Sequence, residues 1–497
     1  MTDYELLGMS PVKRAGYKLK KSVTGFPKVF KIKMTGVGNA IASVFKSIGS
    51  LIKEMSNALT KGNIGNKLSF FIMGSGNILN GQLVKGFLFI STQIAFFLYI
   101  SGFGWQYIKD IGTLGTNAGS EVFDPVDQIY RYVQPDNSMK ILLFGVFSLI
   151  LTLVFFGIYI SSIKDGYRAF QMKTTGRKPP GFIEEINDLF DKKFHKTLLA
   201  LPTLMVSAFT IIPIIFMVLI AFTNFDKSHQ PPGNLFTWVG LINFKDLIWN
   251  DPMKSNTFIS LLGWTLTWAV LATFSNYILG MILAFMINKK GIKLKRMWRT
   301  IFIVTAAVPQ FVSLLLMSQL LTDQGSLNTI LKELGIIEKS IPFLTDATLA
   351  RMSVVVINIW VGIPYTMLIT TGILMNIPED LYESARIDGA GPIITFTKIT
   401  LPYMLFVTTP YLITQFVGNI NNFNVIYLLT RGNPLSTDYF QAGKTDLLIT
   451  WLYKQTVNEQ NYNLASAIGI VTFVLVASMS LLVYNSSKSA KKESDFQ

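Results

Sequence analysis

Eight apolar stretches, each long enough to cross a bilayer, constrain the fold of this chain more than any other feature. A helix needs roughly 20 apolar residues to span the hydrocarbon core. Because 50% of the residues are hydrophobic and 15% are charged, the composition agrees with a membrane protein. We therefore predict an all-α polytopic membrane protein with about eight transmembrane helices. The apolar runs lie near residues 86–107, 140–163, 197–223, 258–287, 300–321, 352–374, 403–428 and 464–485.

Lys and Arg residues are concentrated in alternate connections between these runs. Residues 1–67 hold twelve of them, residues 164–196 hold eight, and residues 288–299 hold six. Since basic connections stay in the cytoplasm, both termini and the connection at 375–402 are predicted to be cytoplasmic. The net charge of +15 then reflects membrane topology, and no nucleic-acid partner is expected.

The N-terminal region contains a candidate amphipathic helix. Apolar residues recur at helical spacing from residue 41 to residue 59, with Lys46, Lys53 and Glu54 elsewhere on the helical wheel. Such a helix either lies on the anionic inner leaflet or packs on the cytoplasmic side of the protein itself. The sequence leaves both interpretations open.

Several kinds of chemistry are excluded by residues that the sequence lacks. With no cysteine and two isolated histidines, His195 and His229, neither a metal centre nor a redox thiol is expected. The interiors of the eight apolar runs contain no ionisable residue, which disfavours coupling to an ion gradient. No G-x-x-x-x-G-K-[ST] phosphate loop occurs either. We therefore expect no catalytic residue and no cofactor in this chain, and the energy for active transport must come from a partner.

The polar connection at 375–402 has the sequence of two short helices joined by a turn. Pro378 suits the first turn of a helix, and Pro392 restarts a helix after the break. Gly389 and Gly391 permit backbone angles that are closed to other residues. The side chains predicted to line the inner side of the second helix are Ile393, Phe396 and Ile399.

This connection resembles the EAA loop of binding-protein-dependent ABC importer permeases. The resemblance rests on E-S-A at 383–385, on D-G-A at 388–390, and on Ile399, Leu401 and Pro402. In that family the helical pair sits in a cleft of a cytoplasmic ATPase, which binds ATP and Mg²⁺. The resemblance implies an ATPase-coupling role for Glu383, Ser384, Ala385, Asp388, Gly389 and Ala390. Ser384 stands in place of the usual second alanine and keeps a small side chain there.

The resemblance extends over most of residues 197–485 and is greatest to the larger membrane subunit of maltose and maltodextrin importers. It implies the type I ABC importer permease fold. That subunit has a large external domain in Gram-negative bacteria, where this chain has about 34 residues, Asn224 to Thr257. A Gram-positive plasma membrane and a lipid-anchored binding protein are therefore expected. The segments that carry the resemblance are WVGIPYTMLITTGILMNIPEDLYESARIDGAG (360–391), TDQGSLNTILKELG (322–335) and QFVGNINNFNVIYLLTRGNP (415–434).

The expected organisation has four parts. A basic N-terminal region (1–85) precedes two additional transmembrane helices and a cytoplasmic loop (86–196). A six-helix permease core (197–486) contains the coupling loop, and a cytoplasmic tail (487–497) follows.

A candidate sugar site follows from the residue types in the seventh apolar run. Sugars are bound by amides and hydroxyls, which match their OH groups, and by aromatic faces. Asn419 and Asn422 are three residues apart, so they share a helix face, with Phe423 next to it. The alternative is that these amides bond a helix of the partner permease.

The resemblance adds positions that border the sugar in the maltose-type subunit. Ala306 and Gly418 stand where aromatic residues occur in that relative, and Gln310 and Gln415 replace small hydroxyl residues. A reshaped pocket with room for a longer oligosaccharide is therefore expected, and the choice among maltodextrin, raffinose-like and other sugars stays open. Pro309 and Pro364 are expected to interrupt their helices. The complete set is Ala306, Gln310, Gly362, Tyr365, Gln415, Gly418, Asn419 and Asn422.

The predicted function is that of a permease subunit which moves an oligosaccharide by alternating access. The expected partners are a second membrane permease, two ATPase subunits and an extracellular substrate-binding protein. The alternatives are a permease for amino acids or polyamines, a stand-alone secondary sugar carrier, and a membrane scaffold that transports nothing. Charged pocket residues would favour the first alternative, and ionisable residues inside the membrane would favour the second.

Overall fold

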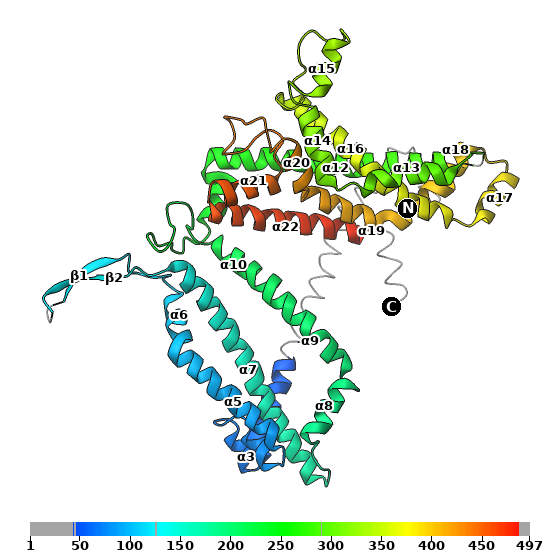
Figure 1. Cartoon of the computed structure of the whole chain (residues 1–497). Coiled ribbons are helices and arrows are strands. Elements are labelled where there is room, and N and C mark those ends of the chain that lie inside the picture. The colour runs from blue at the N-terminus through cyan, green and yellow to red at the C-terminus, as the bar shows by residue number, and fades with distance from the viewer. Residues whose placement is uncertain (1–42, 44–45, 125–126, 290, 487–497) are drawn as a thin grey trace, which may run out of the picture. The chain divides into compact units, whose positions relative to one another are not determined.

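The computed structural model describes residues 43, 46–124, 127–289 and 291–486. The chain divides into two compact units, the first made of residues 1–216 and 231–235 and the second of residues 217–230 and 236–497. Both units are mainly helical (Figure 1).

The first unit is built around a long helix, α7 (Ser138–Thr174), against which the segment from α5 to α6 packs. An ion pair between Lys85 and Glu185, at 2.7 Å, and a second between Lys85 and Asp165 join α5, α7 and α8. The other elements are α3 (Ile64–Leu68), α4 (Ser75–Leu79), α5 (Leu83–Tyr99), a π-helical turn (Ile100–Gly104), α6 (Trp105–Asp110), α8 (Phe182–Phe190), α9 (Phe194–Val206), a second π-helical turn (Ser207–Ile211) and α10 (Ile212–Ile220), which crosses into the second unit.

A two-stranded antiparallel hairpin in the first unit is an exception to the predicted all-α fold. Strand β1 (Ser120–Asp124) pairs with β2 (Ile129–Val133), and Phe123 lies opposite Tyr130. The two rings are 5.2 Å apart. This part of the chain is rich in aromatic and β-branched residues, which favour a strand.

The second unit contains two long helices, α12 (Pro252–Asn288) and α16 (Ala347–Met375). Each begins after an aspartate, Asp251 or Asp346, whose carboxylate accepts two backbone N–H groups of the first turn. The remaining elements are α11 (Ile242–Lys245), α13 (Lys295–Ala307), α14 (Gln310–Leu320), α15 (Ser326–Glu333), α17 (Glu379–Ile387), α18 (Pro392–Thr395), α19 (Leu401–Ile420), α20 (Phe423–Leu429), α21 (Leu448–Tyr453) and α22 (Tyr462–Ser486), with π-helical turns at Asp246–Asn250, Phe396–Thr400 and Lys454–Asn458.

Six helical segments of the described chain are long and apolar enough to span a membrane. The two other predicted runs, 300–321 and 403–428, each form two helices in place of one continuous helix. The first is broken at Val308 and Pro309, as the proline predicts, and the second at Asn421 and Asn422. The expected interruption at Pro364 is wrong, because α16 runs through it. The six segments are Leu83–Asp110, Ser138–Thr174, Phe194–Ile220, Pro252–Asn288, Ala347–Met375 and Tyr462–Leu481.

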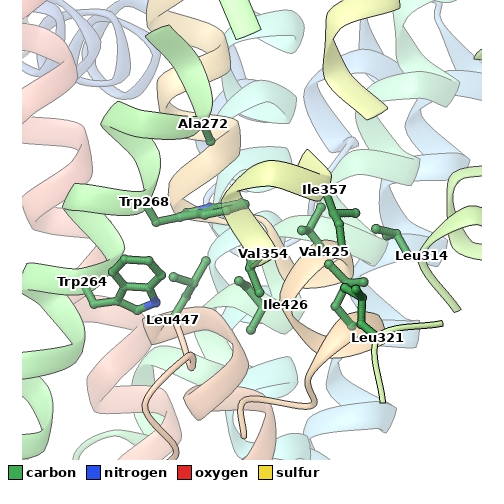
Figure 2. Close-up of a cluster of buried hydrophobic side chains, with 11 residues drawn as sticks. Trp264, Trp268, Ala272, Leu314, Leu321, Val354, Ile357, Val425, Ile426 and Leu447 are labelled. Atoms are coloured by element: carbon green, nitrogen blue, oxygen red, sulfur yellow. The ribbon is translucent and has the colours of Figure 1, made fainter. Parts of the chain in front are cut away.

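Helices α12 and α16 approach each other closely because glycines lie between them. A Cβ added at Gly280 of α12 would lie 2.6 Å from the Cβ of Thr366. Lipid supplies little hydrophobic driving force, so close packing of small residues holds membrane helices together. Farther along the same two helices lies a core with Trp264, Trp268 and residues of α14, α16 and α20 (Figure 2).

A buried ion pair fixes the loop between α20 and α21. Asp446 is fully buried, and its carboxylate accepts from Lys454 Nζ at 2.6 Å, from the Gly443 N–H at 2.7 Å and from the Thr450 hydroxyl at 2.9 Å. Burial raises the pKa of the Asp446 carboxyl, whereas these three donors oppose that rise. The loop is therefore tied to the helix that follows it.

Residues 46–61 of the predicted amphipathic helix are helical, whereas positions 41, 44 and 45 of that pattern lie outside the described residues. Glu54 pairs with Lys164 of α7 at 2.7 Å. On the same helix Ile52 is 61% exposed. The helix thus touches its own unit on one side and leaves apolar side chains uncovered within the chain, so both interpretations stay predictions.

Candidate functional site: a polar cavity between membrane helices

A cavity of about 560 Å³ lies in the second unit, among α12, α16, α19 and the break between α13 and α14. Its volume is typical of a small-molecule site. The break exposes a short non-helical stretch, Val308 and Pro309, which lines the cavity together with Gln310 and Ser313. Irregular backbone at membrane depth is tolerated where it borders such a cavity.

Seven of the eight predicted substrate residues line this one cavity. The eighth, Ala306, belongs to α13 and directly precedes Ala307, which does line it. The structure therefore brings together residues from three regions of the sequence, at about 310, 362 and 418, that the resemblance grouped. Their role in binding a sugar stays a prediction. The seven are Gln310, Gly362, Tyr365, Gln415, Gly418, Asn419 and Asn422.

The two asparagines of the seventh run already have partners inside this chain. Asn419 Nδ2 donates to Thr273 Oγ1 at 2.9 Å, and the Asn419 carbonyl accepts from Trp268 Nε1 at 3.0 Å. Asn422 Nδ2 donates to Asn419 Oδ1 at 3.4 Å, while its Oδ1 accepts the Val425 N–H at 3.3 Å and so caps α20. Both side chains thus have a structural role, and their hydrogen bonds join α12, α19 and α20 of the same subunit.

Two further amides line the cavity, and the sequence patterns did not single them out. Asn276 Oδ1 and Asn358 Nδ2 are buried atoms without a hydrogen-bond partner in the described chain. Buried polar atoms are nearly always bonded, so each of these atoms has hydrogen-bonding capacity that the described chain leaves unused beside the cavity. A Cβ at Gly362 would lie 2.2 Å from Asn276 Nδ2, so the glycine leaves room for this amide. The sequence signal that could have identified these two residues is an asparagine within an otherwise apolar helix.

The rest of the lining consists of aromatic rings, hydroxyls and apolar groups. Tyr365 is 60% exposed and Trp360 is 50% exposed, and both border the cavity with Tyr277 and Tyr411. Among the described residues that line it, none is Asp, Glu, Lys, Arg or His. Such a surface suits a neutral polyhydroxy ligand, because aromatic faces pack on CH groups and amides bond OH groups.

The coupling segment forms a short helix, a turn and a second short helix. Gly389 has φ +74°, which favours glycine, and the Ala390 N–H returns to the Ala385 carbonyl at 2.8 Å. Gly391, at φ −70°, caps α18 and does not need that freedom. From Pro392 the chain stays helical through a π-helical turn into α19.

Most of the predicted coupling side chains are exposed on this segment. Glu383, Ser384, Asp388 and Gly389 are exposed, and Ala390 is half-buried. Ala385 is buried against its own chain, so it does not face outward. The prediction for Ile393 is wrong, because this side chain is 79% exposed, whereas Phe396 packs against Phe285. Ile393 follows the turn directly and lies beyond the reach of the neighbouring helices.

Comparison with known proteins gives consistent matches. Residues 276–492 match the family "Binding-protein-dependent transport system inner membrane component". The galactooligosaccharides transport system permease protein GanP of Bacillus subtilis is 35% identical over 425 residues, which cover 85% of this chain and 97% of that protein. The maltodextrin transport system permease protein MalC of Streptococcus pneumoniae is 36% identical over 425 residues, 83% of this chain and 93% of that protein.

Among solved structures, a bacterial ABC transporter involved in the import of the acidic polysaccharide alginate matches 60% of this chain and 96% of its own, with 23% identity and a TM-score of 0.49. The permeases from Bacillus and Streptococcus are aligned over nearly their full length. The chain therefore belongs to the family of binding-protein-dependent transport system inner membrane components.

Proposed function

We propose that this chain is the sugar-conducting permease subunit of an ATP-driven importer, and that its substrate is a neutral oligosaccharide. The observation that carries the proposal is the uncharged cavity with its amides, hydroxyls and aromatic rings. The transport of galactooligosaccharides and of maltodextrin by the two relatives supports the same substrate class. An amino acid or a polyamine would need a charged partner in the cavity, and the described lining offers none.

In this proposal the sugar is bound by seven predicted residues together with Asn276 and Asn358. The two unpartnered amide atoms accept or donate to sugar hydroxyls, and Tyr365 stacks on a ring face. Gln310 and Gln415 reach hydroxyls from the two sides of the cavity. Ala306 and Gly418 carry little or no side chain, which leaves room for a longer ligand.

The partners are a second permease, two ATPase subunits that bind ATP and Mg²⁺, and an extracellular binding protein held by a lipid anchor. In this proposal the coupling segment and both termini lie in the cytoplasm of a Gram-positive cell, and the Lys and Arg residues of the basic connections support the cytoplasmic side. ATP-driven closure of the ATPases moves α17 and α18, and the cavity opens outward to accept the sugar. ATP hydrolysis returns the cavity to the inward-facing state, so that sugar transport is coupled to ATP hydrolysis through this chain.

The test is a reconstituted complex of all subunits in proteoliposomes, supplied with ATP. We expect ATP-dependent uptake of labelled maltodextrins or galactooligosaccharides, with no uptake of labelled amino acids or of spermidine. Uptake that continues without ATPases in a proton or sodium gradient would establish a secondary carrier and overturn the proposal. ATP turnover without uptake of any solute would favour the scaffold alternative.

A further inference from the structure

In the segment before α5, residues 63–82, most uncharged polar side chains are buried and most large apolar side chains are exposed, whereas Lys67 is exposed and Met73 is buried. It contains α3, an irregular turn at 69–74, and α4, and it packs against α7. Its most buried polar side chains are Asn66, Ser69, Asn77 and Asn80. In the first unit its uncovered side chains are Ile64, Leu68, Phe71, Ile72 and Leu79, of which Phe71 is 79% exposed. A cap exposed to water would have the opposite arrangement.

The backbone polar groups of the irregular turn are bonded by side chains of the two neighbouring membrane spans. Gln93 of α5 bonds two of them, accepting from the Met73 N–H at 2.7 Å and donating to the Phe71 carbonyl at 2.8 Å. From α7, Tyr159 donates to the Phe70 carbonyl at 2.8 Å, and Ser162 accepts the Gly74 N–H at 2.9 Å. Side chains of the protein thus bond backbone N–H and C=O groups that would otherwise bond water. Non-helical backbone at membrane depth requires such bonds, because no water is available there.

These partners also indicate how deep the turn lies. The ion pair between Lys85 and Asp165 marks the polar end of α5 and α7. Gln93 lies about 12 Å beyond Lys85 along α5, and Tyr159 about 9 Å before Asp165 along α7, at 1.5 Å per residue. The turn therefore lies on the order of 10 Å beyond the ion pair, within the apolar part of both spans.

Glycines allow this close approach to the spans. Gly74 has φ +80°, and a Cβ there would lie 2.2 Å from the Gly86 carbonyl oxygen of α5. A Cβ at Gly166 of α7 would lie 3.2 Å from the Gly76 Cα of α4. Helix α5 also carries exposed apolar side chains directly after the segment, at Phe87 and Leu88.

We propose that residues 63–82 form a re-entrant hairpin, which enters one leaflet and returns to the same side, with Phe71 and Ile72 in contact with lipid acyl chains. The asparagine and serine network inside the hairpin replaces water for its backbone. The hairpin thus anchors the N-terminal unit in the leaflet beside α5 and α7.

The chain has no cysteine, so single cysteines can report on this site in the full-length chain assembled with its partners. Phe71→Cys carries a bimane label in proteoliposomes whose lipids bear a nitroxide on the upper acyl chain. Leu98→Cys, on a 68% exposed position of α5, is the control in lipid, and Arg177→Cys, in the loop after α7, is the control in water.

We expect bimane at Phe71→Cys to be quenched as strongly as at Leu98→Cys, and this cysteine not to react with a membrane-impermeant maleimide from either side. Reaction as fast as that of Arg177→Cys would overturn the proposal in favour of a cytoplasmic cap. Protection from maleimide without quenching would overturn it in favour of cover by another protein surface. Ile72→Cys is the second variant if Phe71→Cys does not assemble, and the same outcomes decide.

Discussion

The side chain of Asn422 has two roles that one pair of substitutions can separate. It caps α20 through the Val425 N–H at 3.3 Å and lines the cavity. Serine is a good N-cap, but it is too short to keep the bond to Asn419 or to reach a ligand. Leucine loses the cap as well as these two contacts. We therefore compare Asn422→Ser with Asn422→Leu in the assembled complex.

The bond lengths set the expected size of each effect. At 3.3 Å and 3.4 Å both hydrogen bonds of Asn422 are long, so the cap should contribute about 0.5–1 kcal/mol, the lower part of the usual range. A lost hydrogen bond to the sugar costs about 1 kcal/mol, which corresponds to roughly fivefold weaker binding. Asn422→Ser should weaken sugar binding about fivefold at nearly unchanged stability, and Asn422→Leu should lower both.

The assay is equilibrium binding of a radiolabelled oligosaccharide to the purified membrane complex without the extracellular binding protein, so that the cavity is measured. Thermal unfolding and size-exclusion chromatography of the same samples report stability and assembly. Sugar binding by Asn422→Ser equal to that of the unmodified complex would refute the role of this amide in binding. Dissociation of the complex in Asn422→Leu, with normal binding by the intact fraction, would assign Asn422 to packing alone.

Three further substitutions test the coupling segment, the buried ion pair and the helix contact. Gly389→Trp strains a backbone at φ +74°, but a Cβ at this position meets no atom of the described residues within 4 Å, so the protein should insert while sugar-dependent ATPase activity is lost; normal uptake would contradict a coupling role. Lys454→Met should destabilise the complex by about 3–5 kcal/mol, because Asp446 is left charged and buried. This deficit should shrink as the pH falls and Asp446 binds a proton, and Asp446→Asn in the same chain should restore part of the melting temperature; a pH-independent deficit would refute the argument. Gly280→Val should cost about 1–3 kcal/mol through overpacking against α16, whereas the matched Gly372→Val, where the chain leaves open space, should melt as the unmodified complex does.

The apolar runs predicted the membrane helices well where apolar residues predominate in every turn of the helix. They failed at Asn421 and Asn422, because the preference of asparagine for an N-cap competes with helix continuation, and hydropathy does not register that competition. The hairpin at 120–133 was missed because its β-branched and aromatic residues stand in adjacent pairs, such as Val122-Phe123 and Tyr132-Val133, and do not alternate with polar residues. A hairpin of two five-residue strands is also too short to alter the hydropathy pattern that predicts the membrane spans.

The candidate cavity could be grouped from the sequence through resemblance, since spacing alone does not show which helix faces meet. Asn276 and Asn358 were missed for this reason: their helices, α12 and α16, are far apart in the chain, and a single amide has no period. The apolar run from Leu68 to Met73 was likewise too short to predict a membrane segment. Its depth depends on hydrogen bonds to Gln93 and Tyr159 that only the folded unit shows.

The unbroken helical path from Pro392 to Ile420 has a thermodynamic consequence. It joins the turn that follows Gly389 to the wall that holds Gln415 and Asn419, over roughly 40 Å of helix. Whatever displaces one end of such a rod displaces the other, and linkage requires the influence to be mutual. In the proposed importer, a sugar bound at the far end therefore changes the affinity of the ATPase for nucleotide by the same factor by which nucleotide changes the affinity for the sugar.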